Sequence, residues 1–290
     1  MFDTFRNRLE LTGTLTTVTA LRISQGRSTE PIGSDLPVVK DSLGRPLIPG
    51  ASFKGAMRSR LESFLRGIDP DLAIDPNELT SQPWRDRIKA LKERYQNDDA
   101  TLTAEILKQE NTDLVSRLFG SPWIASKFQV RDLTVFPDAW FGQYQERDGV
   151  AIDRDTETAA DGKLYDFQVV PAGTPFEFKA IVENAEDWEL GLLMIGLHQF
   201  ETEQIPLGGG RSRGLGVVRL EVADVWWFDY PDGKPDELLT YLKRLVTGEK
   251  DHYKLTSDSF ESHKQDWTEA LITKLSEKTQ SNAATASSAS

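Results

Sequence analysis

Five glycines and two arginines fall within the ten residues Leu207-Gly208-Gly209-Gly210-Arg211-Ser212-Arg213-Gly214-Leu215-Gly216. Glycine lacks a Cβ atom and adopts positive φ without strain, so such a backbone can approach a polyanion and point successive N–H groups at it. Arg211 and Arg213 add positive charge. No Lys-Ser/Thr pair of a P-loop follows, and the stretch precedes a predicted strand instead of opening a helix, which excludes a Rossmann fingerprint. A phosphate-binding loop and a flexible turn without ligand remain as the two interpretations.

The segments around this loop predict one antiparallel sheet with two helices. Residues 188–200 space their Leu and Met side chains as one face of a helix, and residues 217–227 have the composition of a strand. Alternating apolar and polar side chains predict three more strands, at 9–23, 128–136 and 174–182. A further helix is expected to start at Ser52, whose side chain can cap it. The resulting order of elements, β-α-β-β-α-β, indicates a ferredoxin-like (RRM-like) α+β fold. The sheet of this fold is a common RNA-binding platform.

The remaining segments are peripheral to that sheet. One is charged and helix-prone, and a second, 143–168, is polar with few apolar anchors and is expected to project as a hairpin. The last ten residues are almost all Ser and Ala, which is typical of disorder. The core is predicted to consist of two parts, 1–66 and 119–230, separated by a helical insertion at 67–118. A helical C-terminal extension at 231–280 and a disordered tail at 281–290 follow the core.

Composition excludes several classes of protein. Of the 290 residues, 38% are hydrophobic and 28% charged, which is typical of a folded globular chain. The absence of cysteine excludes a disulfide framework, a thiolate nucleophile and Cys-ligated zinc. No apolar run approaches the ~20 residues of a membrane helix, and residues 1–8 lack the apolar stretch of a secretory signal. A cytoplasmic protein with no membrane partner is therefore expected.

The net charge of −12 is distributed unevenly along the chain. Residues 1–66 contain ten Lys and Arg against six Asp and Glu, a net charge of +4, so the remainder carries −16. Chance clustering of surface charge is one interpretation. The other is a polarised molecule whose basic face meets phosphate groups while its acidic part faces solvent.

Three motifs, in this order along the chain, carry a family resemblance. The first is Gly33-Ser34-Asp35-Leu36-Pro37-Val38-Val39-Lys40-Asp41, continued by Pro49-Gly50-Ala51-Ser52-Phe53-Lys54-Gly55-Ala56-Met57-Arg58. The second is Leu118-Phe119-Gly120 leading to Phe128-Gln129-Val130-Arg131-Asp132, and the third is the glycine-rich stretch 207–216. Together they resemble the RAMP superfamily of CRISPR proteins, in particular the target-RNA-cleaving backbone subunits of type III effector complexes, of the Csm and Cmr types.

The resemblance implies a subunit that polymerises along a CRISPR RNA and cuts the target RNA paired to it, in antiviral defence. Asp35 falls on the position of the cutting aspartate, although an aspartate beside Gly and Ser is otherwise typical of a turn. A carboxylate near a scissile phosphate can hold a divalent cation, which we expect to be Mg²⁺, or position the attacking 2′-hydroxyl. The prediction is therefore a metal-dependent endoribonuclease. A non-catalytic structural RNA-binding subunit is one alternative. The other is a CRISPR RNA-processing endoribonuclease, which would usually have a histidine near the first loop or helix, whereas this chain has no histidine before His198.

The same resemblance implies RNA contacts in three places. Lys54 and Arg58 are one turn apart on the predicted first helix and can face one phosphate track, although a solvated helix face has the same spacing. The segment 143–168 matches the family's projecting thumb, unless it is a disordered acidic loop. Its expected wedge between base pairs consists of Val150, Ile152, Leu164 and Tyr165. In the glycine-rich loop the expected RNA contacts are Gly208, Gly209, Gly210, Arg211, Ser212, Arg213 and Gly214. The expected partners are CRISPR RNA, target RNA and other effector subunits, including copies or paralogues of this chain.

Overall fold

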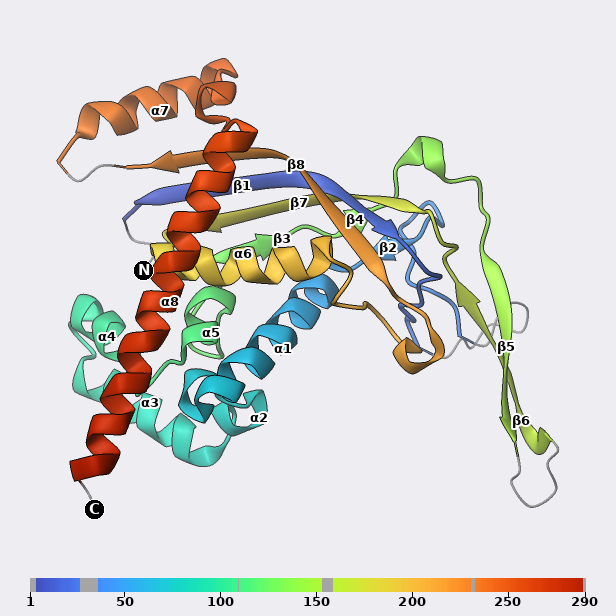
Figure 1. Ribbon diagram of the computed structural model, residues 1–290, viewed down its shortest axis with the longest axis horizontal. Helices are drawn as coiled ribbons and strands as arrows, with labels where there is room; N and C mark the ends of the chain where they lie inside the picture. Colours follow the sequence, from blue (N-terminus) through green and yellow to red (C-terminus); the bar gives the residue numbers. More distant parts are fainter. Residues whose placement is uncertain (1–3, 27–35, 109, 153–158, 231–232, 289–290) are drawn as a thin grey trace.

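The computed structural model describes residues 4–26, 36–108, 110–152, 159–230 and 233–288, with side chains described except at 150–165 and 279–288. A four-stranded antiparallel sheet in the order β3-β7-β1-β8 forms its centre (Figure 1). The strands are β1 (Asn7–Thr17), β3 (Phe128–Val130), β7 (Pro175–Glu183) and β8 (Val218–Asp229). Helix α1 (Gly50–Ile68) lies between β1 and β3 in the chain, and α6 (Asp187–Glu201) lies between β7 and β8. The ferredoxin-like α+β prediction is confirmed.

The core lies between one face of the sheet and the two helices α1 and α6. Leu9, Leu11 and Leu15 of β1 are fully buried, because alternate residues of a strand point to the same face. Phe53 of α1 stacks on Phe200 of α6 with ring centroids 4.2 Å apart. Burial of these large apolar side chains stabilises the packing of the helices on the sheet.

The beginning of α1 differs from the prediction. Ser52 does not cap the helix, which starts two residues earlier, at Gly50. The Gly50 N–H donates to Oδ1 of Asp132 at 2.8 Å, so the capping group comes from a segment 82 residues away. A Cβ on Gly50 would lie 2.5 Å from the carbonyl oxygen of Val130, which explains why glycine stands here. The first and second motifs therefore meet at this helix start.

Two predicted strands are shorter than expected. β1 ends at Thr17, and of the predicted strand residues beyond it only Leu21 forms a bridge, isolated from the named strands. The 128–136 segment divides into β3 and β4 (Leu133–Thr134), and β4 pairs with β2 (Leu47–Ile48) in a separate small sheet. The division falls at Asp132, whose carboxylate is used to cap α1.

Helices occupy most of the segment 67–118. They are η1 (Pro70–Leu72), α2 (Pro76–Leu79), α3 (Gln82–Arg94), α4 (Asp99–Ile106) and α5 (Leu114–Phe119). The C-terminal extension contains α7 (Pro235–Thr247), η4 (Lys250–Tyr253) and α8 (Ser257–Ser288). In place of the predicted disordered tail at 281–290, α8 continues to Ser288, and the alanines in this segment favour a helix.

The C-terminal extension packs on both faces of β8. Phe228 stacks on Tyr241 of α7 with ring centroids 4.0 Å apart, and Nζ of Lys250 lies 3.9 Å from the ring centroid of Trp226. Trp227, between them in the strand, packs on Trp267 of α8 with centroids 5.3 Å apart. Along β8 the face of the sheet opposite α6 is thus covered by the protein itself. Trp226 and Phe228 are therefore in contact with the C-terminal extension.

A two-stranded antiparallel hairpin extends away from the sheet (Figure 1). Its strands are β5 (Gln145–Ile152) and β6 (Ala159–Val169), and the short helix η2 (Pro137–Ala139) precedes it. The backbones of Val150 and Leu164 are partners in the register, as are those of Gly149 and Tyr165. The side chains of the predicted wedge, at positions 150, 152, 164 and 165, lie outside the described residues. In the described part of the chain no helix is both long and apolar enough to cross a membrane.

Candidate functional site

The glycine-rich loop contains one turn of 3-10 helix, η3 (Arg211–Arg213), between two glycines in the left-handed region. Gly210 and Gly214 both have φ of 78°, a conformation that glycine adopts without strain. Residues 211–214 are exposed. Nε of Arg211 donates to the Gly208 carbonyl at 3.1 Å, which keeps this side chain close to the loop. The turn thus presents two guanidinium groups at the surface.

The loop is docked on residues 20–22, which follow the end of β1. The N–H of Gly209 donates to the Arg22 carbonyl at 2.8 Å, and the N–H of Gly216 donates to the Ala20 carbonyl at 2.9 Å. A Cβ on Gly208 would lie 2.1 Å from the Arg22 oxygen, far closer than any van der Waals contact. Gly208 is therefore needed for docking the loop.

Two other glycines of the loop border open space. A Cβ on Gly209 or Gly214 would meet no atom within 4 Å. These positions, beside the exposed residues 211–213, leave room for a ligand, but their N–H groups are already donated to the carbonyls of Arg22 and Arg211. The glycines therefore have two different functions, because docking requires Gly208 whereas Gly209 and Gly214 leave the outer side of the loop accessible.

A small apolar cluster joins three distant parts of the sequence beneath the loop. Its buried members are Ala20, Phe167, Val169 and Leu215, and Leu36 packs against them. The N–H of Gln168 donates to the Leu36 carbonyl at 3.1 Å. The cluster thus holds together the first loop, the base of the hairpin and the glycine-rich loop. Asp35, which directly precedes Leu36, lies outside the described residues.

Two further cations contact aromatic rings at the two ends of the hairpin base, Phe167 in β6 and Tyr144 just before β5. The guanidinium carbon of Arg22 lies 4.5 Å from the ring centroid of Phe167, a cation–π contact that orients the side chain at the hairpin base. Nζ of Lys40 lies 4.5 Å from the ring centroid of Tyr144. Neither residue was predicted to be a site residue, and each is one of ten basic residues before position 67. Their contacts with aromatic rings form only when the hairpin packs against the first loop, so the sequence alone does not reveal them.

The described carboxylate closest in sequence to Asp35 is that of Asp41, and it serves the local fold. Asp41 accepts hydrogen bonds from the backbone of Leu43 and from the backbone and side chain of Arg45, all at 2.8–2.9 Å. Burial alone would raise the pKa of the Asp41 carboxyl, but these hydrogen bonds outweigh it and lower the pKa. Among the described residues no group of three or more His, Asp or Glu could hold a metal ion. Asp35, the one carboxylate predicted to act at this site, lies outside the described residues, and Asp41 is occupied by Arg45.

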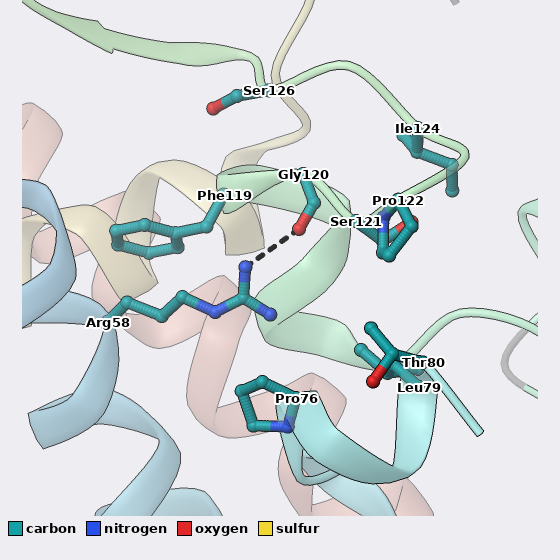
Figure 2. Close-up of a pocket in the computed structure, with 10 residues that line it drawn as sticks. All are labelled: Arg58, Pro76, Leu79, Thr80, Phe119, Gly120, Ser121, Pro122, Ile124 and Ser126. Atoms are coloured by element: carbon teal, nitrogen blue, oxygen red, sulfur yellow. Dashed lines mark hydrogen bonds between the residues drawn. The ribbon is translucent and has the colours of Figure 1, made fainter. Parts of the chain in front are cut away.

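Lys54 and Arg58 lie on α1, away from this cluster, and Arg58 lines a cavity between α1, α2 and α5 (Figure 2). Arg58 donates to the Gly120 carbonyl at 2.8 Å, to Oε1 of Glu62 at 2.7 Å and to Oγ of Ser116 at 3.1 Å. Nζ of Lys54 lies 2.5 Å from Oγ of Ser126. The two cations share one face of α1, as predicted, but that face meets protein acceptors instead of an open phosphate track or bulk solvent.

The environment of Lys54 predicts a pH dependence of stability. Burial, followed by the positive charge of Arg58, lowers the pKa of Lys54 to about 8, against 10.5 for the free side chain. Between these two pH values the unfolded chain keeps the proton and the folded chain releases it, so stability rises with pH. We expect the free energy of unfolding of the wild type to increase relative to Lys54→Met from pH 8 to pH 10, in urea titrations. A difference that stays constant over this range would contradict the burial of a charged Lys54.

The comparison with known protein families covers the region that builds the loop, the cluster and the hairpin. The model of a family described as the RAMP superfamily matches residues 14–219. The chain belongs to the RAMP superfamily. The match takes in the β-hairpin, both core helices and the glycine-rich loop, whereas α7 and α8 lie beyond it.

Three curated proteins are similar to this RAMP chain, and each is named CRISPR system Cms endoribonuclease Csm3. The one from Enterococcus italicus is 26% identical over 231 residues, covering 76% of this chain and 92% of that protein. The one from Streptococcus thermophilus is 26% identical over 220 residues, covering 70% and 82%. The one from Mycobacterium tuberculosis is 50% identical over 73 residues, covering 24% and 31%. With the first and second of these proteins, the similarity extends over most of both chains.

Proposed function

We propose that this RAMP chain is a backbone subunit of a type III CRISPR effector complex, which binds the CRISPR RNA and cleaves the target RNA paired to it in antiviral defence. The observation that carries the proposal is the apolar cluster of Leu36, Phe167 and Leu215 with Ala20 and Val169. It brings an exposed pair of arginines, the base of a projecting hairpin and the loop of Asp35 to one place. The names of the relatives, all endoribonucleases of CRISPR systems, support the same reaction class.

The parts of this surface have complementary tasks. Arg211 and Arg213 bind phosphates of the guide strand, with Arg22, held against Phe167, as a third cation. The hairpin enters the guide–target duplex and unstacks it with the apolar residues Val150, Ile152, Leu164 and Tyr165. Asp35 directly precedes Leu36, which packs against the cluster, and its carboxylate acts on the backbone of the opposing target strand.

Cleavage at Asp35 agrees with the chemistry of a single loop carboxylate. Mg²⁺ often binds one or two protein carboxylates and takes its other ligands from phosphate oxygens and water. Bound in this way it would supply a Lewis acid at the scissile phosphate. Asp35 would hold the cation or orient the 2′-hydroxyl, and the neighbouring Asp41 remains committed to Arg45.

Removal of the two loop arginines is expected to weaken guide binding. In Arg211→Gln/Arg213→Gln we expect a loss of about tenfold or more in affinity for guide RNA and a salt dependence shallower by about 1.4 logarithmic units, since each phosphate contact to a single strand contributes about 0.7. Affinity measured at several salt concentrations gives both quantities. A control that removes two exposed charges elsewhere, Arg219→Gln/Lys243→Gln, should retain the slope. An unchanged slope in the loop variant would refute phosphate binding by these arginines.

The identity of the bound RNA tests the proposal as a whole. The protein is purified from its host under native conditions, and the RNA that remains bound is sequenced. We expect short RNAs with a repeat-derived tag at one end, together with other effector subunits. Bound RNA without any repeat sequence, or recovery of the protein without RNA at low salt, would refute the proposed function.

A further inference from the structure

A cavity of about 400 Å³ lies between α2, α3 and the segment that follows α5. Its floor is apolar and consists of Leu79, Ile88, Pro122 and Trp123. Leu79 and Ile88 are buried, with 2% and 4% of their surface exposed. It adjoins the cavity of Arg58, about 380 Å³, because both are lined by Leu79, Thr80 and Pro122 (Figure 2). We call these two adjoining cavities together the α3 groove.

The rim of the α3 groove is cationic. Arg85, Lys89 and Lys92 line it at spacings of four and three residues, which places them on one face of α3, and all three are exposed. Arg58 lines the adjoining part. Among the described residues that line either cavity there is no Asp or Glu. Arg58 is already paired with Glu62, and Nζ of Lys89 lies 3.7 Å from Oε1 of Glu93. On a chain with a net charge of −12, a rim of three exposed cations with no lining carboxylate is nevertheless a local exception that favours a polyanion.

Two tryptophans, Trp123 and Trp84, lie next to these charges. Trp123 lines the groove and stacks on Trp84 of α3, with ring centroids 6.1 Å apart and an angle of 13° between the rings. The guanidinium carbon of Arg87 lies 5.6 Å from the ring centroid of Trp84 on the same helix. A stacked pair of indoles is rigid, so a base that stacks against it loses little side-chain entropy in the protein.

We propose that the α3 groove binds single-stranded RNA, with its phosphates on Arg85, Lys89 and Lys92 and a base against Trp123. Cations that track a backbone beside an aromatic platform are the usual means of holding a single strand without sequence preference. A duplex fits less well, because its bases are stacked on one another and are not presented to an indole. None of the residues lining the groove belongs to the cluster or to the glycine-rich loop, so this site is additional to the guide-binding surface.

The test removes the three charges of the rim from the full-length chain. In Arg85→Gln/Lys89→Gln/Lys92→Gln we expect the salt dependence of binding to a short oligouridylate to become shallower by about 2 logarithmic units, at about 0.7 per phosphate contact. The control Lys234→Gln/Lys243→Gln/Lys264→Gln removes three lysines from the C-terminal extension and should leave the slope unchanged. Because all three rim side chains are exposed, we expect thermal unfolding of the variant to match the wild type.

Photocrosslinking locates the RNA independently of affinity. Oligouridylate with 4-thiouridine should crosslink to peptides containing Trp123 and α3, and Trp123→Leu should reduce this crosslink several-fold. The same crosslink should persist in Arg211→Gln/Arg213→Gln. RNA binding by the α3 groove and guide binding by the glycine-rich loop can therefore be refuted independently of each other. Crosslinks confined to the glycine-rich loop, with an unaltered salt slope in the rim variant, would overturn the proposal. Loss of self-association in the rim variant with RNA binding intact would overturn it in favour of an acidic protein partner.

Discussion

Replacing Asp35 with alanine is expected to lower the rate of target RNA cleavage by at least about 10²-fold, while the affinity for guide and target RNA remains within about twofold of the wild type. The rate falls because the carboxylate that binds the cation or positions the nucleophile is lost, and contributions of this kind are worth about 10²–10⁴-fold. Binding is retained because phosphate contacts come from Arg211, Arg213 and Arg22. The measurement is single-turnover cleavage of labelled target RNA by the assembled complex.

Asp41 provides a matched control for Asp35. It is also a loop aspartate, but its carboxylate is bound by Arg45 and by two backbone N–H groups. Asp41→Asn should therefore lower thermal stability slightly and leave cleavage close to the wild-type rate. Equal cleavage by the wild type and Asp35→Ala, or no cleavage by either with guide binding intact, would support the non-catalytic subunit. Cutting of the guide precursor in place of the paired target would support the processing enzyme.

Chelation of divalent cations separates the two roles that remain for Asp35. If the carboxylate acts through Mg²⁺, EDTA should reduce wild-type cleavage to the level of Asp35→Ala, and added Mg²⁺ should restore it in the wild type alone. Persistent cleavage in EDTA would assign Asp35 to the orientation of the 2′-hydroxyl without a metal.

The order of strands and helices in the core could be predicted because it depends on local patterns. Alternation in β1 and β7 and the helical spacing in α6 each arise from one buried face, and a one-residue shift would expose that face to solvent. The start of α1 could not be predicted in the same way. Ser52 has the right chemistry for a cap, but Asp132 takes this position from a turn that is distant in sequence.

The candidate site shows the same division between local and distant determinants. The exposed turn of Arg211 and Arg213 was predictable from its composition alone. The contact of Arg22 with Phe167 was not, because 145 residues separate the partners and neither has an unusual neighbourhood in the sequence. For Lys54 and Arg58 the sequence correctly indicated one shared helix face. It could not indicate that this face packs against Ser126 and Gly120 of the same chain.

The second large effect is expected at a single glycine of the loop. Gly208→Ala should destabilise the chain by about 2–3 kcal/mol, since φ of 74° is strained for alanine and its Cβ would lie 2.1 Å from the Arg22 carbonyl oxygen. Relief of this clash requires the loop to separate from residues 20–22, which breaks the hydrogen bond from Gly209 to Arg22. Guide RNA affinity should then fall by about tenfold or more, because Arg211 and Arg213 lose their fixed position.

Gly209→Ala is the matched control, one residue further along the same loop. Position 209 has no positive φ, and a Cβ there would meet no atom within 4 Å, so stability should stay within about 0.5 kcal/mol of the wild type. Urea denaturation and guide binding of both variants test the pair. If Gly208→Ala matches Gly209→Ala in both measurements, docking of the loop on Arg22 does not position the arginines. If Gly208→Ala loses stability but keeps guide affinity, the two arginines bind RNA without the docked conformation, and the glycines serve the fold alone.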